Sequence, residues 1–104
     1  MYKVVTTWAL VDTGAGSGLI DPEIVRRLEL SIFDTGTATT VNAETRVNRF
    51  NVLVSAAADR WDTLLVAERP IGHMHGAGMI LGCDWLNNKS LLFDGPRHRF
   101  TITW

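Results

Sequence analysis

The stretch Ala9-Leu10-Val11-Asp12-Thr13-Gly14-Ala15 is the one around which the chain is organised. Its apolar residues predict a buried strand, and Gly14 predicts the tight turn at which that strand ends. A carboxylate at the buried end of a strand is costly unless it has a partner or a function. Thr13 can fix the loop by hydrogen bonding, and Gly14 lets a backbone or a ligand approach closely. Taken alone, the stretch is equally consistent with a strand that ends in an ordinary Asp-Gly type of turn.

A second apolar stretch, Met79-Ile80-Leu81-Gly82-Cys83-Asp84-Trp85-Leu86, changes that balance. It predicts another strand that ends in glycine, followed by a short helix with Asp84 at its N-cap. Cys83 has apolar neighbours, so we interpret it as a buried structural thiol and not as a nucleophile. Because the chain has one cysteine, it contains no intramolecular disulfide.

Together the two stretches resemble the retropepsin-like aspartic proteases, the single-domain relatives of pepsin. The resemblance rests on residues 10–15, on residues 80–86 and on the closing strand from Leu91 to Asp94. It implies that residues 1–104 form one all-β domain, with a closed barrel-like retropepsin fold and one or two short helices. It also implies an aspartic endopeptidase whose substrate is a polypeptide in extended conformation.

Hydrolysis by such an enzyme needs two carboxylates that hold one water between them. Like charges so close cannot both ionise, so the pair shares one proton. The ionised member takes a proton from the attacking water, while the protonated member polarises the carbonyl and assists the leaving amine. The chain has one convincing aspartate for this task, Asp12, so a two-fold axis must bring Asp12 beside its own copy. We therefore expect a homodimer that uses neither a metal nor another cofactor.

The resemblance also assigns expected functions to the residues around Asp12. Thr13 would hydrogen-bond across the dimer axis, and Gly14 would present its carbonyl to the substrate backbone. Ala15 would lie close to the bound peptide, and Ile80 would line a side-chain pocket beside the catalytic pair. Terminal strands often build the shared sheet of such dimers. Whether residues 2–7 or residues 101–104 do so here is left open by the sequence.

Residues 37–47 and 49–54 are rich in Thr and Val and predict the strands of a hairpin around Asn42-Ala43-Glu44. By position this hairpin would be the flap that closes over the substrate. Flaps in the family usually carry glycine near the tip, and here only Asn42 tolerates a left-handed turn well. The expected substrate contacts at the tip are Val41, Asn42 and Ala43.

The run Asp34-Thr35-Gly36-Thr37 repeats the signature found at Asp12. No second Ile-Leu-Gly element follows it at a matching distance. Two catalytic aspartates so close in sequence cannot belong to two lobes, because each lobe requires a whole domain. We therefore predict that this repeat is a turn entering the next hairpin.

Two helices and the flanking strands complete the prediction. Asp21-Pro22-Glu23 is typical of a helix start, and the helix is expected over residues 22–30. Residues 2–7 are expected to extend the strand that leads to Asp12, and residues 61–67 and 98–104 alternate as strands do.

Composition limits the classes of function. The 104 residues suffice for one domain, and 46% hydrophobic with 20% charged residues is ordinary for a globular protein. A net charge of −1 without any run of Lys or Arg argues against a nucleic-acid binder. The chain shows neither a signal peptide nor an apolar stretch of membrane-spanning length. We expect a domain that makes no membrane contact and is cytoplasmic rather than secreted, although it can be part of a longer or anchored precursor.

Three rival functions remain open. The first is a catalytically silent retropepsin fold used for dimerisation or peptide binding. The second is a zinc hydrolase, because His73 and His75 would share one face of a strand; His98 is the only further histidine, however. The third is a structural β-barrel module without a site.

Overall fold

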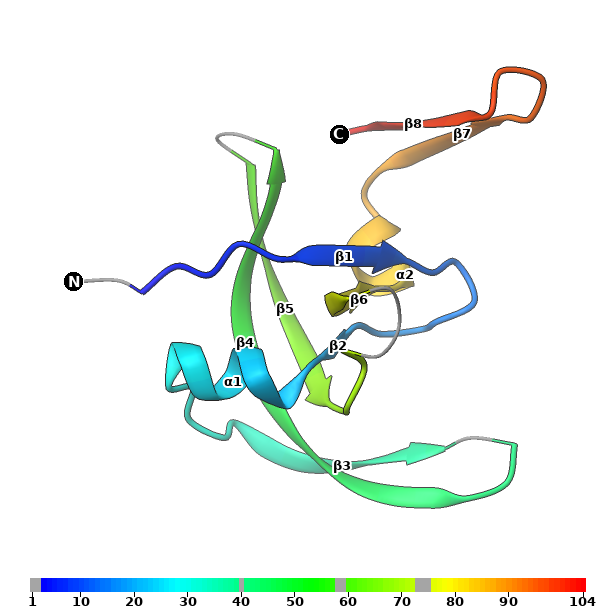
Figure 1. Cartoon of the computed structure of the whole chain (residues 1–104). Helices are drawn as coiled ribbons and strands as arrows, with labels where there is room; N and C mark the ends of the chain where they lie inside the picture. Colours follow the sequence, from blue (N-terminus) through cyan, green and yellow to red (C-terminus); the bar gives the residue numbers. More distant parts are fainter. Residues whose placement is uncertain (1–2, 40, 58–59, 73–75) are drawn as a thin grey trace.

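The computed structural model describes residues 3–39, 41–57, 60–72 and 76–104 (Figure 1). Their backbone forms a six-stranded sheet, a separate two-stranded hairpin and two short helices. The chain is therefore mostly β with few helices, as predicted. The elements are β1 (Trp8–Val11), β2 (Leu19–Ile20), α1 (Pro22–Leu28), β3 (Asp34–Thr39), β4 (Glu44–Ala57), β5 (Arg60–Glu68), β6 (Ala77–Leu81), α2 (Cys83–Leu86), β7 (Ser90–Asp94) and β8 (Arg99–Thr103).

The order of strands in the large sheet is β1-β6-β2-β5-β4-β3. Strand β6 lies between β1 and β2, parallel to the first and antiparallel to the second. Since β1 and β2 are consecutive in the chain, the loop that joins them, residues 12–18, must cross the end of β6. This crossing brings the two stretches singled out in the sequence into contact.

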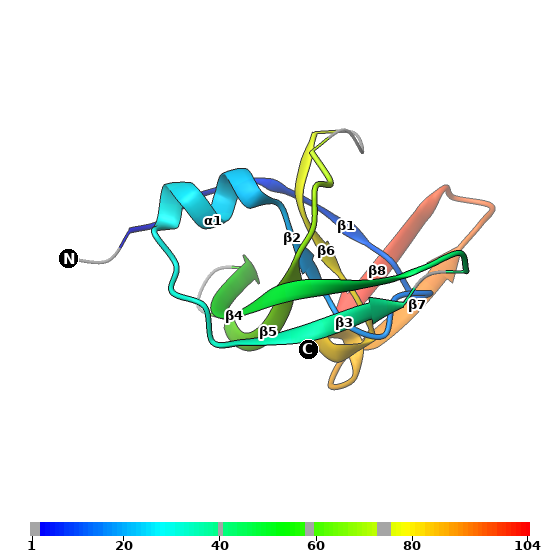
Figure 2. The ribbon, with the colours of Figure 1, turned by 90° about the horizontal axis from the view of Figure 1, so that it is seen from below.

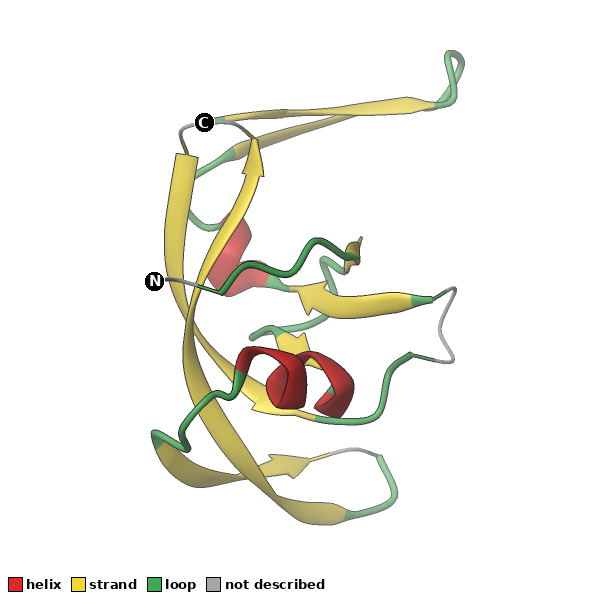
Figure 3. Ribbon diagram, turned by 60° about the vertical axis from the view of Figure 1, so that its left-hand side comes forward, coloured by secondary structure: helices red, strands yellow, loops and turns green. Residues whose placement is uncertain are grey.

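The six-stranded sheet is open, which corrects the prediction of a closed barrel. Its edge strands are β1 and β3, and no ladder joins them in the part of the chain that the structure describes. The reason lies in the long strand β4: β3 pairs with residues 44–49, whereas β5 pairs with residues 49–57. The two neighbours of β4 thus share only Arg49, and β3 forms an arm beyond the body of the sheet instead of returning to β1 (Figure 3).

The hydrophobic core lies against the middle of this sheet. Strand β6 is buried along its whole length, and α1 contributes Ile24. Phe50 and Val52 are buried with Val54 packed beside them, so these residues form the apolar face of β4. The fully assembled core consists of Ile20, Ile24, Phe50, Val52, Leu64, Val66, Met79, Leu81 and Trp85.

The first helix begins as predicted but ends earlier, and the second begins at a different N-cap from the one predicted. The N-cap of α1 is Asp21 as expected, but the helix ends at Leu28 because Glu29 adopts a left-handed backbone with φ of 53°. The N-cap of α2 is Gly82 and not Asp84. The Asp84 carboxylate instead accepts hydrogen bonds from the backbone N–H groups of Trp85 (2.9 Å) and Gly18 (3.2 Å).

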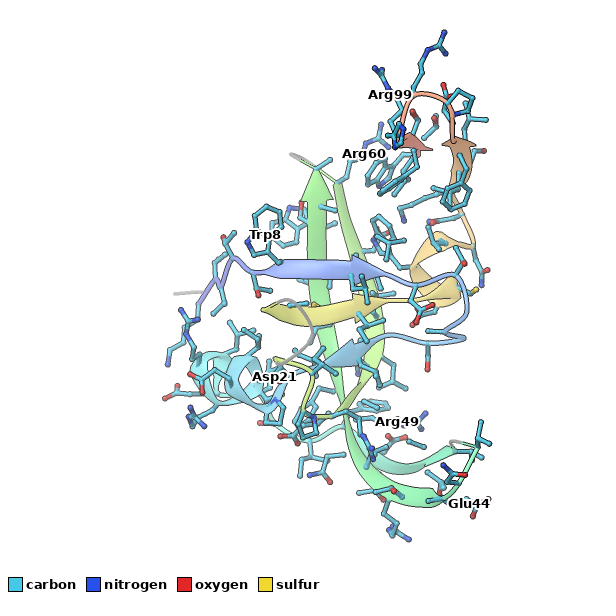
Figure 4. All side chains as sticks on the ribbon, turned by 45° about the vertical axis from the view of Figure 1, so that its right-hand side comes forward. Trp8, Asp21, Glu44, Arg49, Arg60 and Arg99 are labelled. Carbon is cyan, nitrogen blue, oxygen red and sulfur yellow. The ribbon has the colours of Figure 1, made fainter. Side chains whose placement is uncertain are left out.

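The N-terminal strand is shorter and more exposed than predicted. Residues 3–7 form no strand, and Tyr2 lies outside the described residues. Strand β1 is exposed because it is an edge of the sheet: Trp8 is 80% exposed and projects freely (Figure 4). None of the helices in the described ranges is long and apolar enough to cross a membrane.

Candidate active site

Three backbone hydrogen bonds fasten the Asp12 loop to the end of β6 and the start of α2. The N–H of Asp12 donates to the carbonyl of Leu81 at 2.9 Å. The N–H of Cys83 donates to the carbonyl of Ala15 at 2.7 Å, and the N–H of Asp84 donates to that of Gly16 at 3.1 Å. The loop that carries Asp12 is therefore held by hydrogen bonds before Asp12's turn, at Leu81, and after it, at Cys83 and Asp84.

Two glycines make this crossing possible. A Cβ atom at Gly18 would lie 2.8 Å from the carbonyl oxygen of Ile80, and one at Gly82 would lie within 3.1 Å of Ser17 backbone atoms. Neither contact can be relieved by a side-chain rotation, because the opposing atoms belong to the backbone. Gly18, just before β2, and Gly82, just after β6, are thus required by the close passage of the loop over β6.

Asp12 is half-buried, and only part of its carboxylate is engaged. Oδ1 accepts a hydrogen bond from the N–H of Gly14 at 2.8 Å, which fixes the side chain over its own turn. Within the described ranges Oδ2 accepts no hydrogen bond from the protein, and the hydroxyl of Thr13 has no partner either. Both groups remain available for a second chain, a water or a substrate.

A hollow of about 260 Å³ opens beside Asp12. One wall consists of Val11, Asp12 and Thr13, and the other comes from the hairpin of β7 and β8. The residues of that second wall are Leu91, Phe93 and Phe100. The sequence did not predict this wall, although the apolar run of β7 and the alternation of apolar residues along β8 were visible.

The flap-like hairpin of β3 and β4 lies on the opposite side of the Asp12 loop from β7 and β8. Its tip and the loop after β1 lie at the same end of the molecule in two perpendicular views (Figures 1 and 2). Val41, Asn42 and Ala43 at the tip are exposed, as substrate contacts must be. Asn42 does not adopt the left-handed backbone for which it was singled out.

Ile80 and Ala15 occupy different surroundings from each other. Ala15 is half-buried on the loop next to Asp12. Ile80 is 5% exposed, pairs with Leu10 of β1, and is not part of the hollow's lining. Its contact with a bound peptide stays a prediction.

Asp34 starts a strand, not the turn that was predicted, because it pairs with Arg49 of β4. The guanidinium donates from Nε to Oδ1 at 2.6 Å and from Nη2 to Oδ2 at 2.5 Å. This bidentate hydrogen bonding, with burial opposing it, holds the pKa of Asp34 below and that of Arg49 above its ordinary value. Arg49, labelled in Figure 4, lies close to Gly36, where a Cβ would be 3.2 Å from its Nε. The aspartate of the repeated signature thus forms an ion pair with Arg49 at the base of the flap-like hairpin.

The sulfur and histidine side chains that the structure describes do not assemble a metal centre. Cys83 is partly exposed, which corrects the prediction of a buried thiol, because it begins α2 beside the loop; its Sγ donates to the carbonyl of Thr13 at 3.3 Å. The described ranges contain no group of three or more His, Cys, Asp or Glu side chains placed to hold a metal. His73 and His75 lie outside these ranges, and His98 lies in the turn between β7 and β8.

The chain matches no protein-family model, no curated protein and no solved structure.

Proposed function

We propose that this chain is a retropepsin-like aspartic endopeptidase that acts as a homodimer, with one Asp12 from each chain. The observation that carries the proposal is the Asp12 loop. It is fastened by three backbone hydrogen bonds, requires glycine at two crossings, and leaves one carboxylate oxygen unengaged by the described residues. So elaborate a support for a half-buried carboxylate is expected where that carboxylate does chemistry.

The hairpin of β7 and β8 supports the dimer. The two strands alternate, so one face is apolar and the other mostly polar. We name as the apolar face Leu91, Phe93, Phe100 and Ile102. Its inner half is covered, since Ile102 packs on the core, but Phe93 and Phe100 are 68% and 53% exposed.

These two phenylalanines line the same hollow as Asp12. A second copy that brings its own Asp12 beside the first must therefore cover them. Residues 3–7 do not line the hollow. This favours the C-terminal hairpin over the N-terminal segment as the surface shared by the two chains.

In such a dimer the paired Asp12 carboxylates hold a water and share one proton. The ionised carboxylate takes a proton from the water as the water attacks the peptide carbonyl. The other carboxyl group protonates the carbonyl oxygen, and the C–N bond then breaks as the leaving amine takes up a proton. The free hydroxyl of Thr13 suits a hydrogen bond across the axis. Activity is expected to be bell-shaped in pH, because the pair needs one acid and one base.

The substrate class proposed is an extended polypeptide with apolar residues around the cleaved bond. The flap-like hairpin offers backbone groups that an extended peptide can pair with. The apolar preference rests on Ile80, which the resemblance assigns to a side-chain pocket beside the catalytic pair.

A cleavage assay with a peptide library tests the proposal. Asp12→Asn keeps the shape of the side chain and removes its ionisable group, so hydrolysis should fall by orders of magnitude. Asp34→Asn is the matched control from the repeated signature and should keep most of the activity. If both variants fold and lose activity equally, the choice of Asp12 is wrong. A folded wild-type dimer that cleaves no peptide would identify the silent, peptide-binding alternative instead.

A further inference from the structure

We propose that Lys89 is a positioning residue that holds the β7–β8 hairpin in place at the Asp12 hollow. The consequence of this role for the dimer rests on the proposed function. The positioning of the hairpin by Lys89 does not depend on it. Lys89 is the residue before β7, and it contacts the residue that follows β8.

The ammonium group of Lys89 is enclosed by the protein. The side chain is 0% exposed, and Nζ donates to Oδ2 of Asp62 on β5 at 3.0 Å. Nζ also donates to the carbonyl of Trp85 at 2.8 Å and to Oδ1 of Asn88 at 2.9 Å. A buried cation with one carboxylate and two further acceptors is a costly arrangement that needs all of its partners.

Two tryptophan rings complete the enclosure. Nζ lies 4.3 Å from the ring centroid of Trp85 and 5.5 Å from that of Trp104. The rings meet edge to face with their centroids 5.8 Å apart. The distances from Nζ to the two rings are both within the range of cation–π attraction, which is stronger when the cation is shielded from water. The end of the chain is thus attached to α2 and β5 through one ammonium group.

The hairpin depends on this attachment because it has few others. Strands β7 and β8 pair with no strand of the large sheet. Their first and last residues, Ser90 and Thr103, face each other, so Lys89 and Trp104 hold the inner ends of both strands at one point. A two-stranded hairpin is marginal on its own.

The outer end of the same hairpin carries Phe93 and Phe100 to the Asp12 hollow, while its tip with Arg99 projects away from the sheet (Figure 4). A small rotation at the root therefore displaces the two phenylalanines by a larger amount. The cluster of Lys89, Trp85, Trp104 and Asp62 sets the direction in which the apolar face points.

The test compares Lys89→Met, Lys89→Arg and the control Arg97→Met. Methionine keeps an apolar stem and removes the charge, whereas arginine keeps the charge. Arg97 is an exposed cation of the same hairpin and pairs with Asp94. Amide hydrogen exchange is measured separately for β7–β8 and for the β4–β5 ladder, and the dimer dissociation constant is measured by sedimentation.

Lys89→Met should accelerate exchange at least tenfold in β7–β8 while the β4–β5 ladder keeps its protection. Its dimer should weaken at least tenfold, Lys89→Arg should recover most of both properties, and Arg97→Met should change neither. Unchanged exchange in β7–β8, or an equal loss of protection in both regions, would overturn the positioning role. If Lys89→Met does not fold, Trp104→Leu, which removes one of the two rings, takes its place. The same results are expected of it, and the same results would overturn the positioning role.

The exchange measurement does not depend on proteolysis. Selective loosening of β7–β8 in a protein that cleaves no peptide would leave the positioning of the hairpin standing and remove the proposed function. If the protein does cleave peptides, raising the concentration of Lys89→Met should restore its turnover, because the dimer re-forms. Turnover that stays low in the re-formed dimer would contradict a role through the hairpin.

Discussion

A Cβ atom at Gly82 would lie 2.6 Å from the carbonyl oxygen of Ala15. That contact is shorter than side-chain carbons tolerate. The backbone on both sides is also fixed, because the N–H of Cys83, next to Gly82, donates to the same carbonyl. The loop that presents Asp12 and the strand end that supports it are therefore fitted to each other with no room for a methyl group.

Gly82→Ala should destabilise the domain by at least about 2 kcal/mol. Overpacking costs about 1–3 kcal/mol, and here no side-chain rotation can relieve the contact with the backbone. The free energy of unfolding is measured from urea titrations. Gly95→Ala is the control, since a Cβ at Gly95 meets nothing within 4 Å. Equal stabilities of the two variants would contradict the close crossing.

Asp34→Asn should alter the stability in acid. The Arg49 guanidinium, chiefly through its hydrogen bonds, holds the pKa of Asp34 below its ordinary value of 3.8. A carboxyl whose pKa is lower in the folded than in the unfolded chain stabilises the fold fully above the ordinary value, and this contribution disappears as pH falls below it. The variant should be less stable at neutral pH and should lose less stability on acidification.

Unfolding midpoints collected from about pH 2 to pH 7 check this sign. Glu44→Gln removes an exposed carboxylate from the same hairpin and serves as the control. Parallel pH profiles for wild type and Asp34→Asn would show that the ion pair does not stabilise the root of the hairpin.

Asp62→Asn should be costly because it leaves the fully buried ammonium of Lys89 without its carboxylate. Removing one partner of a buried pair costs about 3–5 kcal/mol, and the 20% exposure of Asp62 places the expected loss near about 3 kcal/mol. Asp94→Asn breaks the exposed pair with Arg97 and should cost less than about 1 kcal/mol. Thermal or urea unfolding that ranks the two variants in the reverse order would refute the burial of this cation.

Sequence reasoning was most successful where a feature depends on neighbours in the chain. An apolar run followed by glycine predicted the strand ends at Asp12 and at Gly82, and Asp21 before Pro22 predicted the start of α1. The contact between the two stretches is a finding of the structure, in which the N–H of Cys83 donates to the carbonyl of Ala15.

Features that depend on distant partners were missed. Apolar residues stand at Val47 and then at Phe50 and Val52, so the pattern shifts by one residue at Asn48-Arg49. This shift does not show that β3 and β5 divide β4 there and leave the sheet open, because it does not reveal which strands pair with each half. Lys89 is an ordinary surface residue by type, and its burial depends on Asp62 and Trp104, which the chain brings together only when folded. The aromatic wall of the hollow was missed for the same reason.

The apolar face of the hairpin offers a sharp test of the dimer, because two adjacent exposed residues point to opposite sides. Phe93 and Leu92 are 68% and 66% exposed, but only Phe93 lines the hollow beside Asp12. Phe93→Ser should weaken the dimer about tenfold or more, since an aromatic residue at the centre of an interface commonly contributes over about 1–2 kcal/mol. Leu92→Ser, which removes a similarly exposed apolar side chain from the other face, should leave the dimer unchanged.

Sedimentation and specific activity are measured over one dilution series for wild type and both variants. The specific activity of Phe93→Ser should fall at a higher protein concentration than that of wild type and recover at high concentration, because each chain carries one Asp12. Equal weakening by Leu92→Ser would place the shared surface elsewhere. A species that stays monomeric and still cleaves peptides would overturn the mechanism itself, since one carboxylate cannot serve as the acid and the base in the same step.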